Sequence, residues 1–273
     1  MDLTFPLQKM RAENHVPIAY FHPVDPAFHS SGEFAVNEVL YRKHTLEFQG
    51  QYRCFCGELK KRVYQRNFCY DCFFKLPQAS QSIFKPELSQ AHLGIYERDA
   101  EWEQKVHVQP HFVYLAMTGG EVKVGVTRAN QIPTRWIDQG ATAGLIIAEA
   151  PHRHAAGVIE VALKARVNDK TNWRRMLTTG GGDDAAILLE KRAELLPLVP
   201  EDHQLYSTVE YEPLSLVFPV ETYPSKIKSL NLEKTPQFSG VLIGVKGQYL
   251  IFEDGVVFNI RSNEGKIVRW RID

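Results

Sequence analysis

The sequence lacks the features of a membrane or secreted protein. No apolar run reaches the ~18 residues that a transmembrane helix needs, and residues 1–15 contain no apolar core of the kind found in signal peptides. Cysteine is scarce, with four in 273 residues, all between positions 54 and 72. That pattern favours metal binding over a disulfide framework. We therefore expect a cytoplasmic protein without membrane association.

The chain also lacks a surplus of charge. Its 32 Lys and Arg residues balance 32 Asp and Glu residues, so the formal net charge is zero. Nucleic-acid-binding proteins commonly carry a basic surplus, so any contact with nucleic acid would need a local basic patch. A length of 273 residues allows one large domain or two to three small ones.

The four cysteines form two close pairs. One residue separates Cys54 from Cys56, and twelve residues separate this pair from the next. Two residues then separate Cys69 from Cys72. Two such pairs can surround one Zn²⁺ with four thiolates, and that closed shell leaves no position for a substrate. The pattern predicts a structural zinc site, with four buried thiols or a redox pair as the alternative.

A basic run with one aromatic residue lies between the cysteine pairs. It consists of Lys60, Lys61, Arg62, Tyr64 and Arg66. Such a run can follow a phosphate backbone, and it can equally be a solvated face. The sequence alone leaves both readings open.

The most regular pattern lies in residues 111–180. The predicted elements are, in order, a strand at 112–117, a Gly-Gly turn, a strand at 122–127, a helix at 133–139, a strand at 143–148 and a helix from 151 to about 167. One face of the second strand carries Lys123, Gly125 and Thr127. Gly125 has no side chain, which leaves room there for a ligand or another backbone.

This β-β-α-β-α order and these residues resemble the GIY-YIG nuclease superfamily. The tripeptide Phe112-Val113-Tyr114 stands where that superfamily has Gly-Ile-Tyr, and residues 123–127 stand where it has Tyr-Ile-Gly-x-Thr. The second signature tyrosine is Lys123 here. Arg135 and Glu160 stand at roughly the arginine and glutamate positions of the superfamily.

A closer similarity covers most of the chain. The segments VKVGVTR, PTRWIDQGA, GVIEVALK and DKTNWRRML, with the cysteine cluster and GVLIGVKGQYLIF, are similar to an uncharacterised bacterial and archaeal family, Domain of Unknown Function 2797. That family tends to carry extra cysteines after the first cluster, and this chain has none there. A second metal site is therefore not expected.

The nuclease resemblance implies metal-dependent phosphodiester hydrolysis of DNA or RNA. Glu160 would hold Mg²⁺ or Mn²⁺, and Arg135 would hold the scissile phosphate. Tyr114 would orient or deprotonate the attacking water, helped by Lys123. The expected substrate contacts are Gly125, Thr127, Arg128, Lys170, Asn172 and Arg174.

The whole chain is expected to be an α+β protein. The predicted parts are a β-rich N-terminal segment (1–53), a zinc-binding cluster (54–76), a linker with one short helix (77–110), a GIY-YIG-like α/β domain (111–180), a helical connector (181–200) and a small β-barrel-like C-terminal domain (201–273). Strands are also predicted at 39–41, 208–211 and 214–220. Whether the C-terminal strands pair with the N-terminal ones is left open.

Two other functions stay open. The chain could be a non-catalytic module that binds nucleic acid or protein, with a structural zinc site and a relic central unit. It could also be an enzyme that uses the same cleft on a small molecule, which the zero net charge would suit.

Overall fold

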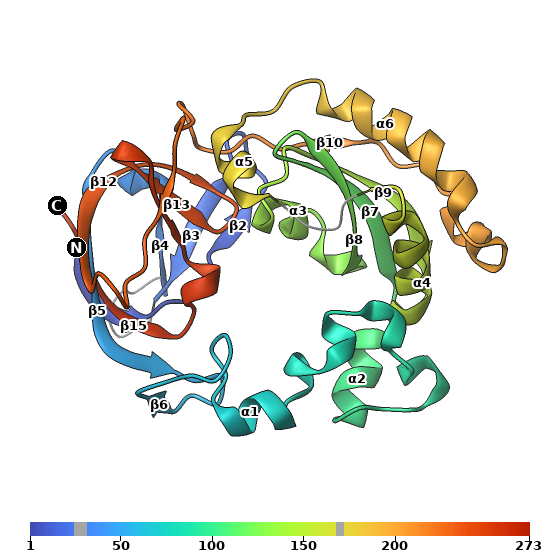
Figure 1. Ribbon diagram of the computed structural model, residues 1–273, viewed down its shortest axis with the longest axis horizontal. Coiled ribbons are helices and arrows are strands. Elements are labelled where there is room, and N and C mark those ends of the chain that lie inside the picture. The colour runs from blue at the N-terminus through green and yellow to red at the C-terminus, as the bar shows by residue number, and fades with distance from the viewer. Residues whose placement is uncertain (25–31, 168–171) are drawn as a thin grey trace. The chain divides into compact units, whose positions relative to one another are not determined.

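The computed structural model describes residues 1–24, 32–167 and 172–273. The chain forms two compact units of mixed α and β structure. The first unit contains Met1–Phe73 and Val217–Asp273, and the second contains Phe74–Leu216. In Figure 1 the first unit is drawn in blue and in orange to red, and most of the second in green and yellow. Among the described residues, no helix has the length and apolar character to cross a membrane.

The first unit is built on a sheet that joins strands from both ends of the chain. Its order is β1 (Asp2–Pro6), β15 (Lys266–Ile272), β5 (Lys43–Arg53), β12 (Gln237–Lys246), β13 (Tyr249–Phe252), β14 (Val256–Asn259) and β11 (Lys228–Ser229), and β6 (Leu59–Lys60) also pairs with β5. The pairs are antiparallel except β11 with β14. The C-terminal strands thus share a sheet with β1 and β5.

Alternation along β15 shows why this strand forms. Val268, Trp270 and Ile272 are buried, and the residues between them are half-exposed, as expected of a strand with one face on the core. The Trp270 indole N–H donates to His44 Nδ1 at 2.9 Å. Its ring also packs against Phe5 and Phe34, so Trp270 lies in an aromatic cluster of the core.

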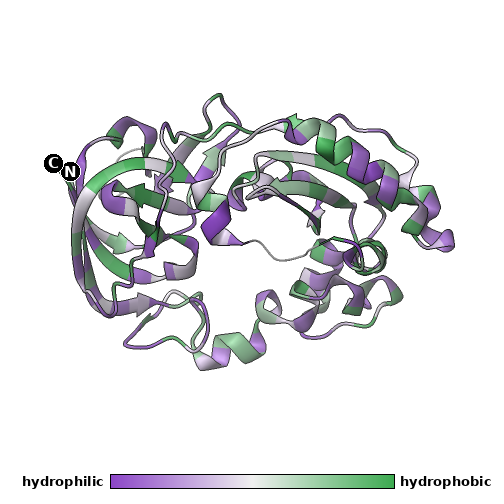
Figure 2. Ribbon diagram, turned by 45° about the horizontal axis from the view of Figure 1, so that its top comes forward, coloured by the Kyte–Doolittle hydropathy of each residue, from purple (hydrophilic) through white to green (hydrophobic). Residues whose placement is uncertain are grey.

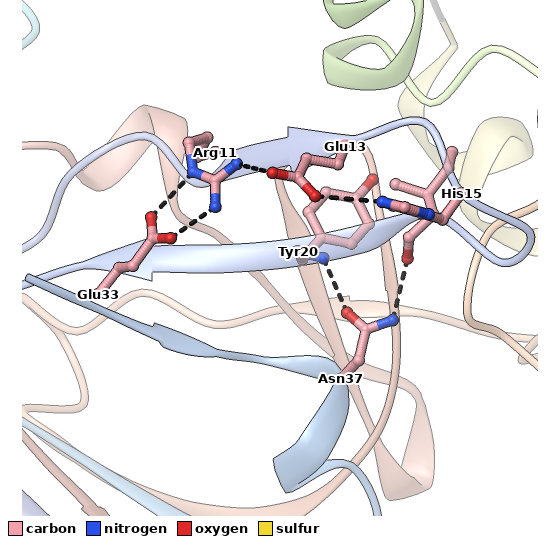
Figure 3. Close-up of polar contacts among 7 residues, drawn as sticks. Arg11, Glu13, His15, Tyr20, Glu33 and Asn37 are labelled. Carbon is pink, nitrogen blue, oxygen red and sulfur yellow. Dashed lines mark hydrogen bonds and ion pairs between the residues drawn. The ribbon is translucent and has the colours of Figure 1, made fainter. Parts of the chain in front are cut away.

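A second, three-stranded sheet lies in the same unit. It contains β2 (Arg11–Glu13), β3 (Ala19–Pro23) and β4 (Glu33–Ala35). Figure 3 shows Arg11 between Glu13 and Glu33, with ion pairs to both. Asn37 bridges to β3, because its Oδ1 accepts from the Tyr20 backbone N–H at 2.8 Å.

The strand predicted at 39–41 is wrong. Asn37–Val39 forms the 3-10 helix η1, and Tyr41 adopts a left-handed conformation with φ of 62°. The Asn37 side chain also donates from Nδ2 to the Ile18 carbonyl at 2.9 Å. This side-chain bridging favours a turn over an extended strand.

The second unit contains a four-stranded antiparallel sheet. Its order is β10 (Leu214–Ser215), β9 (Ala143–Ala150), β7 (His111–Thr118) and β8 (Glu121–Arg128). Gly119 and Gly120, with φ of 62° and 76°, form the predicted turn between β7 and β8. The helices that follow are α3 (Thr134–Asp138), α4 (Arg153–Lys164), α5 (Trp173–Thr178) and α6 (Asp184–Leu195). The predicted strand and helix order of residues 112–167 is confirmed, with shifted ends.

The two faces of this sheet differ. One face packs with α4 and α6 into a core that includes Leu115, Leu145, Ile159 and Leu188. Hydrophobic and hydrophilic segments alternate along α6 in Figure 2. Leu188 and Leu195 are its buried residues, and Ile187 and Leu189 are exposed. The other face, which carries Tyr114, is covered in part by Trp136 from α3.

Residues 77–110 contain the one predicted α-helix, α2 (Ala100–His107), and are otherwise more structured than a linker. The short 3-10 helices are η2 (Pro77–Ala79), η3 (Gln81–Ile83), η4 (Pro86–Leu88) and η5 (Ala91–Leu93). A Cβ at Gly157 of α4 would lie 2.3 Å from the Glu87 backbone nitrogen, so glycine permits this close packing. The segment therefore belongs to the second unit.

Of two strand predictions near residue 210, one fails and the other holds only in part. Residues 208–211 form no strand, because the 3-10 helix η8 (Glu201–Ser207) precedes irregular backbone. Of residues 214–220, only Leu214–Ser215 forms strand β10. Leu216 belongs to the second unit and Val217 to the first. The apolar alternation there comes from packing in two separate cores.

The remaining elements are short or lie near the boundary. They are α1 (Tyr70–Lys75), η6 (Ala129–Gln131), η7 (Leu196–Leu198), η9 (Glu253–Gly255) and η10 (Arg261–Asn263).

Candidate functional sites

The four cysteines gather in the first unit. Cys54 follows β5, Cys56 lies in the turn before β6, and the second pair lies at the start of α1. Their sulfur atoms all lie within 4.8 Å of one another. Four thiolates bound to one Zn²⁺ at about 2.3 Å would stand about 3.8 Å apart. The cluster could therefore hold a zinc ion after small side-chain movements.

Backbone hydrogen bonds shape the first cysteine pair. The Gly57 N–H donates to the Cys54 carbonyl at 2.8 Å, and the Cys54 N–H donates to the Glu58 carbonyl at 2.8 Å. Gly57 has φ of 90°, which favours glycine at this turn. The Cys69 N–H also donates to Cys54 Sγ at 3.1 Å, so the backbone of the second pair contacts the first.

The thiols differ in acidity. Burial raises the pKa values of Cys54 and Cys72. A hydrogen bond from the Cys72 backbone N–H, together with smaller contributions, lowers the pKa of Cys69. Because zinc binds thiolates, binding at neutral pH would release protons from the thiols whose pKa is raised.

A second candidate site lies on the face of the sheet that α3 covers. Tyr114 is fully buried, and its ring lies across Gly125 of the neighbouring strand. A Cβ at Gly125 would lie 2.5 Å from the Tyr114 hydroxyl oxygen. Gln139 Nε2 donates to that oxygen at 2.9 Å. The open space predicted at Gly125 is therefore filled by Tyr114.

Arg135 is exposed on α3 and interacts with Tyr114. The pKa of Arg135 is raised, first by the negative charge that Tyr114 carries when ionised and also by a side-chain hydrogen bond between the two. Asp138 and Glu160 raise it further through their charges. Residues from β7, α3 and α4 thus share one electrostatic environment.

Glu160 is only 7% exposed, and burial raises its pKa. Lys164, one helical turn later, places Nζ 3.4 Å from Glu160 Oε2. Glu160 Oε2 therefore has an ion-pair partner, whereas Oε2 of Glu87 is buried and has no hydrogen-bond partner. The charge of Glu87 also raises the pKa of Glu160. Two carboxylates with buried oxygens whose charges interact could share a divalent cation.

Glu87 and Arg153 are the residues that the sequence interpretation missed here. Arg153 donates from Nε to the Ser82 carbonyl at 2.7 Å and from Nη2 to the Ile83 carbonyl at 2.8 Å. Burial lowers the pKa of Arg153 to about 10, and Glu160 is the largest opposing influence. The signal available in the sequence was Gly157, since a glycine inside a helix can mark a close packing partner.

The other predicted substrate residues are dispersed. Thr127 is buried on β8, and so is Lys123, the predicted helper of Tyr114. Arg128 lies at the end of β8, and its charge influences Arg153. Asn172 Oδ1 accepts from the Arg175 N–H at 3.3 Å as the cap of α5, and Arg174 stacks over Trp173. Asn172 and Arg174 therefore make these contacts within α5 and its cap. Lys170 lies outside the described residues.

Three histidines gather near the start of α4. His92 stacks on His152 with ring centroids 4.2 Å apart and on His154 at 4.8 Å. Burial, followed by the charges of neighbouring histidines, lowers the pKa of His152 to about 4. The His152 ring also caps α4, because Nδ1 accepts from the Ala155 N–H at 3.3 Å. His152 thus has a structural role at the helix start.

The family described as Protein of unknown function (DUF2797) matches residues 42–268. The chain belongs to this family. No curated protein and no solved structure gives a significant match.

The DUF2797 match includes both candidate sites, because residues 54–72 and 114–160 lie inside it. A hollow of about 420 Å³ also lies within it, lined by residues that include Glu121, Lys164 and Lys191. Neither Tyr114 nor Arg135 lines that hollow, but Lys164, the ion-pair partner of Glu160, does.

Proposed function

We propose that this DUF2797 protein is a metal-dependent nuclease whose second unit is GIY-YIG-like and hydrolyses phosphodiester bonds. The order β7-β8-α3-β9-α4 supports the proposal, because it is the order of the superfamily that the sequence resembles. The packing of Tyr114 across Gly125 also supports it, since these are the two signature positions.

One observation carries the proposal. Arg135 is 21 residues from Tyr114 and 25 residues from Glu160 in the sequence, yet a side-chain hydrogen bond joins it to Tyr114 and the charge of Glu160 raises its pKa. A shared environment of a guanidinium and a carboxylate suits a phosphate group and a metal ion together.

Arg135 and Tyr114 differ in solvent exposure, so we assign them different roles. Arg135 is exposed and can donate several N–H groups to a phosphate. Tyr114 is fully buried, so its proposed role is to position Arg135. This differs from the water-activating role that the resemblance implies. Lys123, also buried on β8, would contribute positive charge from the same strand face.

The metal ligands would be Glu160 and Glu87. Glu87 Oε2 is buried without a hydrogen-bond donor, and Glu160 Oε2 has Lys164 Nζ at 3.4 Å as its partner, which a bound ion would replace. Mg²⁺ commonly binds one or two carboxylates while keeping several waters. A bound ion would supply Lewis acidity and an activated water. Arg153 interacts electrostatically with both carboxylates and would limit their mutual repulsion while the ion is absent.

The test is cleavage of end-labelled single- and double-stranded DNA and RNA with Mg²⁺ or Mn²⁺. Wild type is compared with Glu160→Ala and with Glu190→Ala, an exposed glutamate of α6 that serves as control. We expect Glu160→Ala to lower cleavage about 100-fold or more and Glu190→Ala to match wild type. Equal cleavage by all three proteins would refute the proposed site.

Two observations favour a second candidate, a non-catalytic nucleic-acid-binding module. Tyr114 is fully buried, and Lys123 occupies the second signature position. This candidate predicts salt-sensitive binding of nucleic acid without cleavage. Absence of both binding and cleavage would direct the search to small charged substrates.

A further inference from the structure

Large aromatic side chains are exposed around the cysteine cluster. Tyr64 is 55% exposed and Tyr70 is 64% exposed. Their ring centroids lie 5.3 Å apart, nearly perpendicular, and Phe73 lies 5.1 Å from Tyr64. Phe55, between the first two cysteines, is 49% exposed and stacks on buried Phe68. A group of neighbouring exposed rings is unusual on a surface without a binding role.

The same segment is basic although the whole chain is neutral. Residues 58–71 contain four Lys or Arg and two Asp or Glu, against a net charge of zero for the chain. Lys61, Arg62 and Arg66 are all exposed. Partial burial of the Arg66 side chain and then the charge of Arg261 lower the pKa of Arg66, so Arg261 adds positive charge nearby. The aromatic surface is therefore bordered by positive charge.

Hydrogen bonds hold this surface in one conformation. The Tyr64 N–H donates to the Phe68 carbonyl at 2.8 Å, and the Phe68 N–H donates to the Gln65 carbonyl at 3.0 Å. The Phe55 N–H donates to the Asn67 carbonyl at 2.9 Å, which joins the two cysteine loops. A ligand would thus meet preformed rings and lose little affinity to ordering them.

We propose that this surface binds single-stranded nucleic acid, with bases stacking on Tyr64 and Tyr70 and phosphates contacting Lys61, Arg62 and Arg66. The inference shares with the proposed function only the choice of nucleic acid as the ligand. The surface itself and the Tyr114 site lie in different units. Aromatic rings stack on bases of any sequence, and neighbouring cations follow the backbone. In a duplex the base faces are already stacked, so single strands are the preferred ligand.

The experiment measures fluorescence anisotropy with the full, zinc-loaded chain and no added Mg²⁺. The probes are labelled oligo-dT and oligo-U of about 12 nucleotides and a duplex of the same length. The variants are Tyr64→Ala, Tyr70→Ala and Tyr64→Phe. Tyr41→Ala is the control, since Tyr41 is a 54% exposed tyrosine of the same unit. Zinc content and circular dichroism verify folding.

We expect each alanine variant to weaken single-strand binding about ten-fold. Tyr64→Phe keeps the ring and should bind like wild type, as should Tyr41→Ala. A double charge reversal, Lys61→Glu with Arg62→Glu, should reduce the slope of log affinity against log salt by about one to two.

Three results would overturn the inference. They are unchanged binding in both alanine variants, duplex binding as tight as single-strand binding, and no binding of either oligonucleotide, which would leave a protein partner for this surface. Retained binding with no cleavage by any protein would refute only the nuclease proposal. Cleavage with unchanged binding in the alanine variants would refute only the surface proposal.

Discussion

The two units assemble their candidate sites from the chain in different ways. In the first unit all four cysteines lie between residues 54 and 72, and hydrogen bonds within that stretch shape them. In the second unit Glu87, Tyr114, Arg135 and Glu160 come from η4, β7, α3 and α4. The first site can form locally around an ion, whereas the second requires the whole unit to fold. The two sites should therefore be disrupted by different perturbations.

Removal of zinc should have the largest effect, and it should be confined to the first unit. The Cys69→Ser variant is expected to lose most of the roughly one zinc ion per chain that four thiolates would bind. Amide hydrogen exchange in residues 54–73 should then rise by orders of magnitude, while β7–β9 stay protected. Zinc analysis and hydrogen exchange of both proteins test this. Equal loss of protection in the two units would show that they do not fold separately.

Acid should have the next largest effect, a loss of stability in the second unit. Burial lowers the pKa values of His107 and His111 to about 4, from an unfolded value near 6.5. Because the neutral forms favour folding, their stabilisation is complete above pH 6.5 and is lost as the pH falls towards 4. Each should contribute about 2–3 kcal/mol over that range.

The first unit provides a matched case for the acid experiment. His22 is fully buried, and burial also lowers its pKa to about 4. Urea unfolding at several pH values measures both units. His22→Phe should flatten the pH dependence of the first unit and leave that of the second unchanged. A pH-independent second unit between pH 4 and 6.5 would contradict the assignment.

A methyl group at Gly157 should separate η4 from α4. The new Cβ would lie 2.3 Å from backbone, and such overpacking commonly costs about 1–3 kcal/mol. We expect Gly157→Ala to destabilise the second unit by that amount and to lower any activity that needs Glu87. Gly182→Ala is the control, because nothing lies within 4 Å of its Cβ position. Thermal unfolding of both variants measures the difference in stability. Equal midpoints would contradict the close packing of η4 against α4.

The smallest expected effect lies in the first unit. Asn37→Ala removes hydrogen bonds to Tyr20 and Ile18, and should cost about 1–2 kcal/mol. Urea unfolding measures the change. Arg42→Ala is a control, since its side chain makes an exposed bond to the Asp273 carbonyl. A larger loss in the control would contradict the role given to Asn37.

Local patterns explain what the sequence predicted well. The cysteine spacing and the Gly119-Gly120 turn depend on neighbouring residues, and both features appear where they were expected. The helix α4 could be predicted because its apolar residues recur at helical spacing.

Long-range packing explains what the sequence missed. The pairing of β5 with β12 and β15 joins residues about 200 positions apart, and no local pattern encodes it. The same is true of Glu87, whose place beside α4 depends on Gly157. Residues 208–211 have strand-like composition, yet Tyr211 is held by a hydrogen bond from its hydroxyl to Glu149 at 3.0 Å.

The shared sheet of the first unit has a consequence for synthesis of the chain on the ribosome. Strand β5 is made early, but its neighbours β12 and β15 are made only after the entire second unit. The second unit can therefore fold while both edges of β5 still lack their partners. Until the last strands emerge, those edges can pair with other chains. The nascent protein is thus most prone to aggregation late in translation, when most of its residues are already folded.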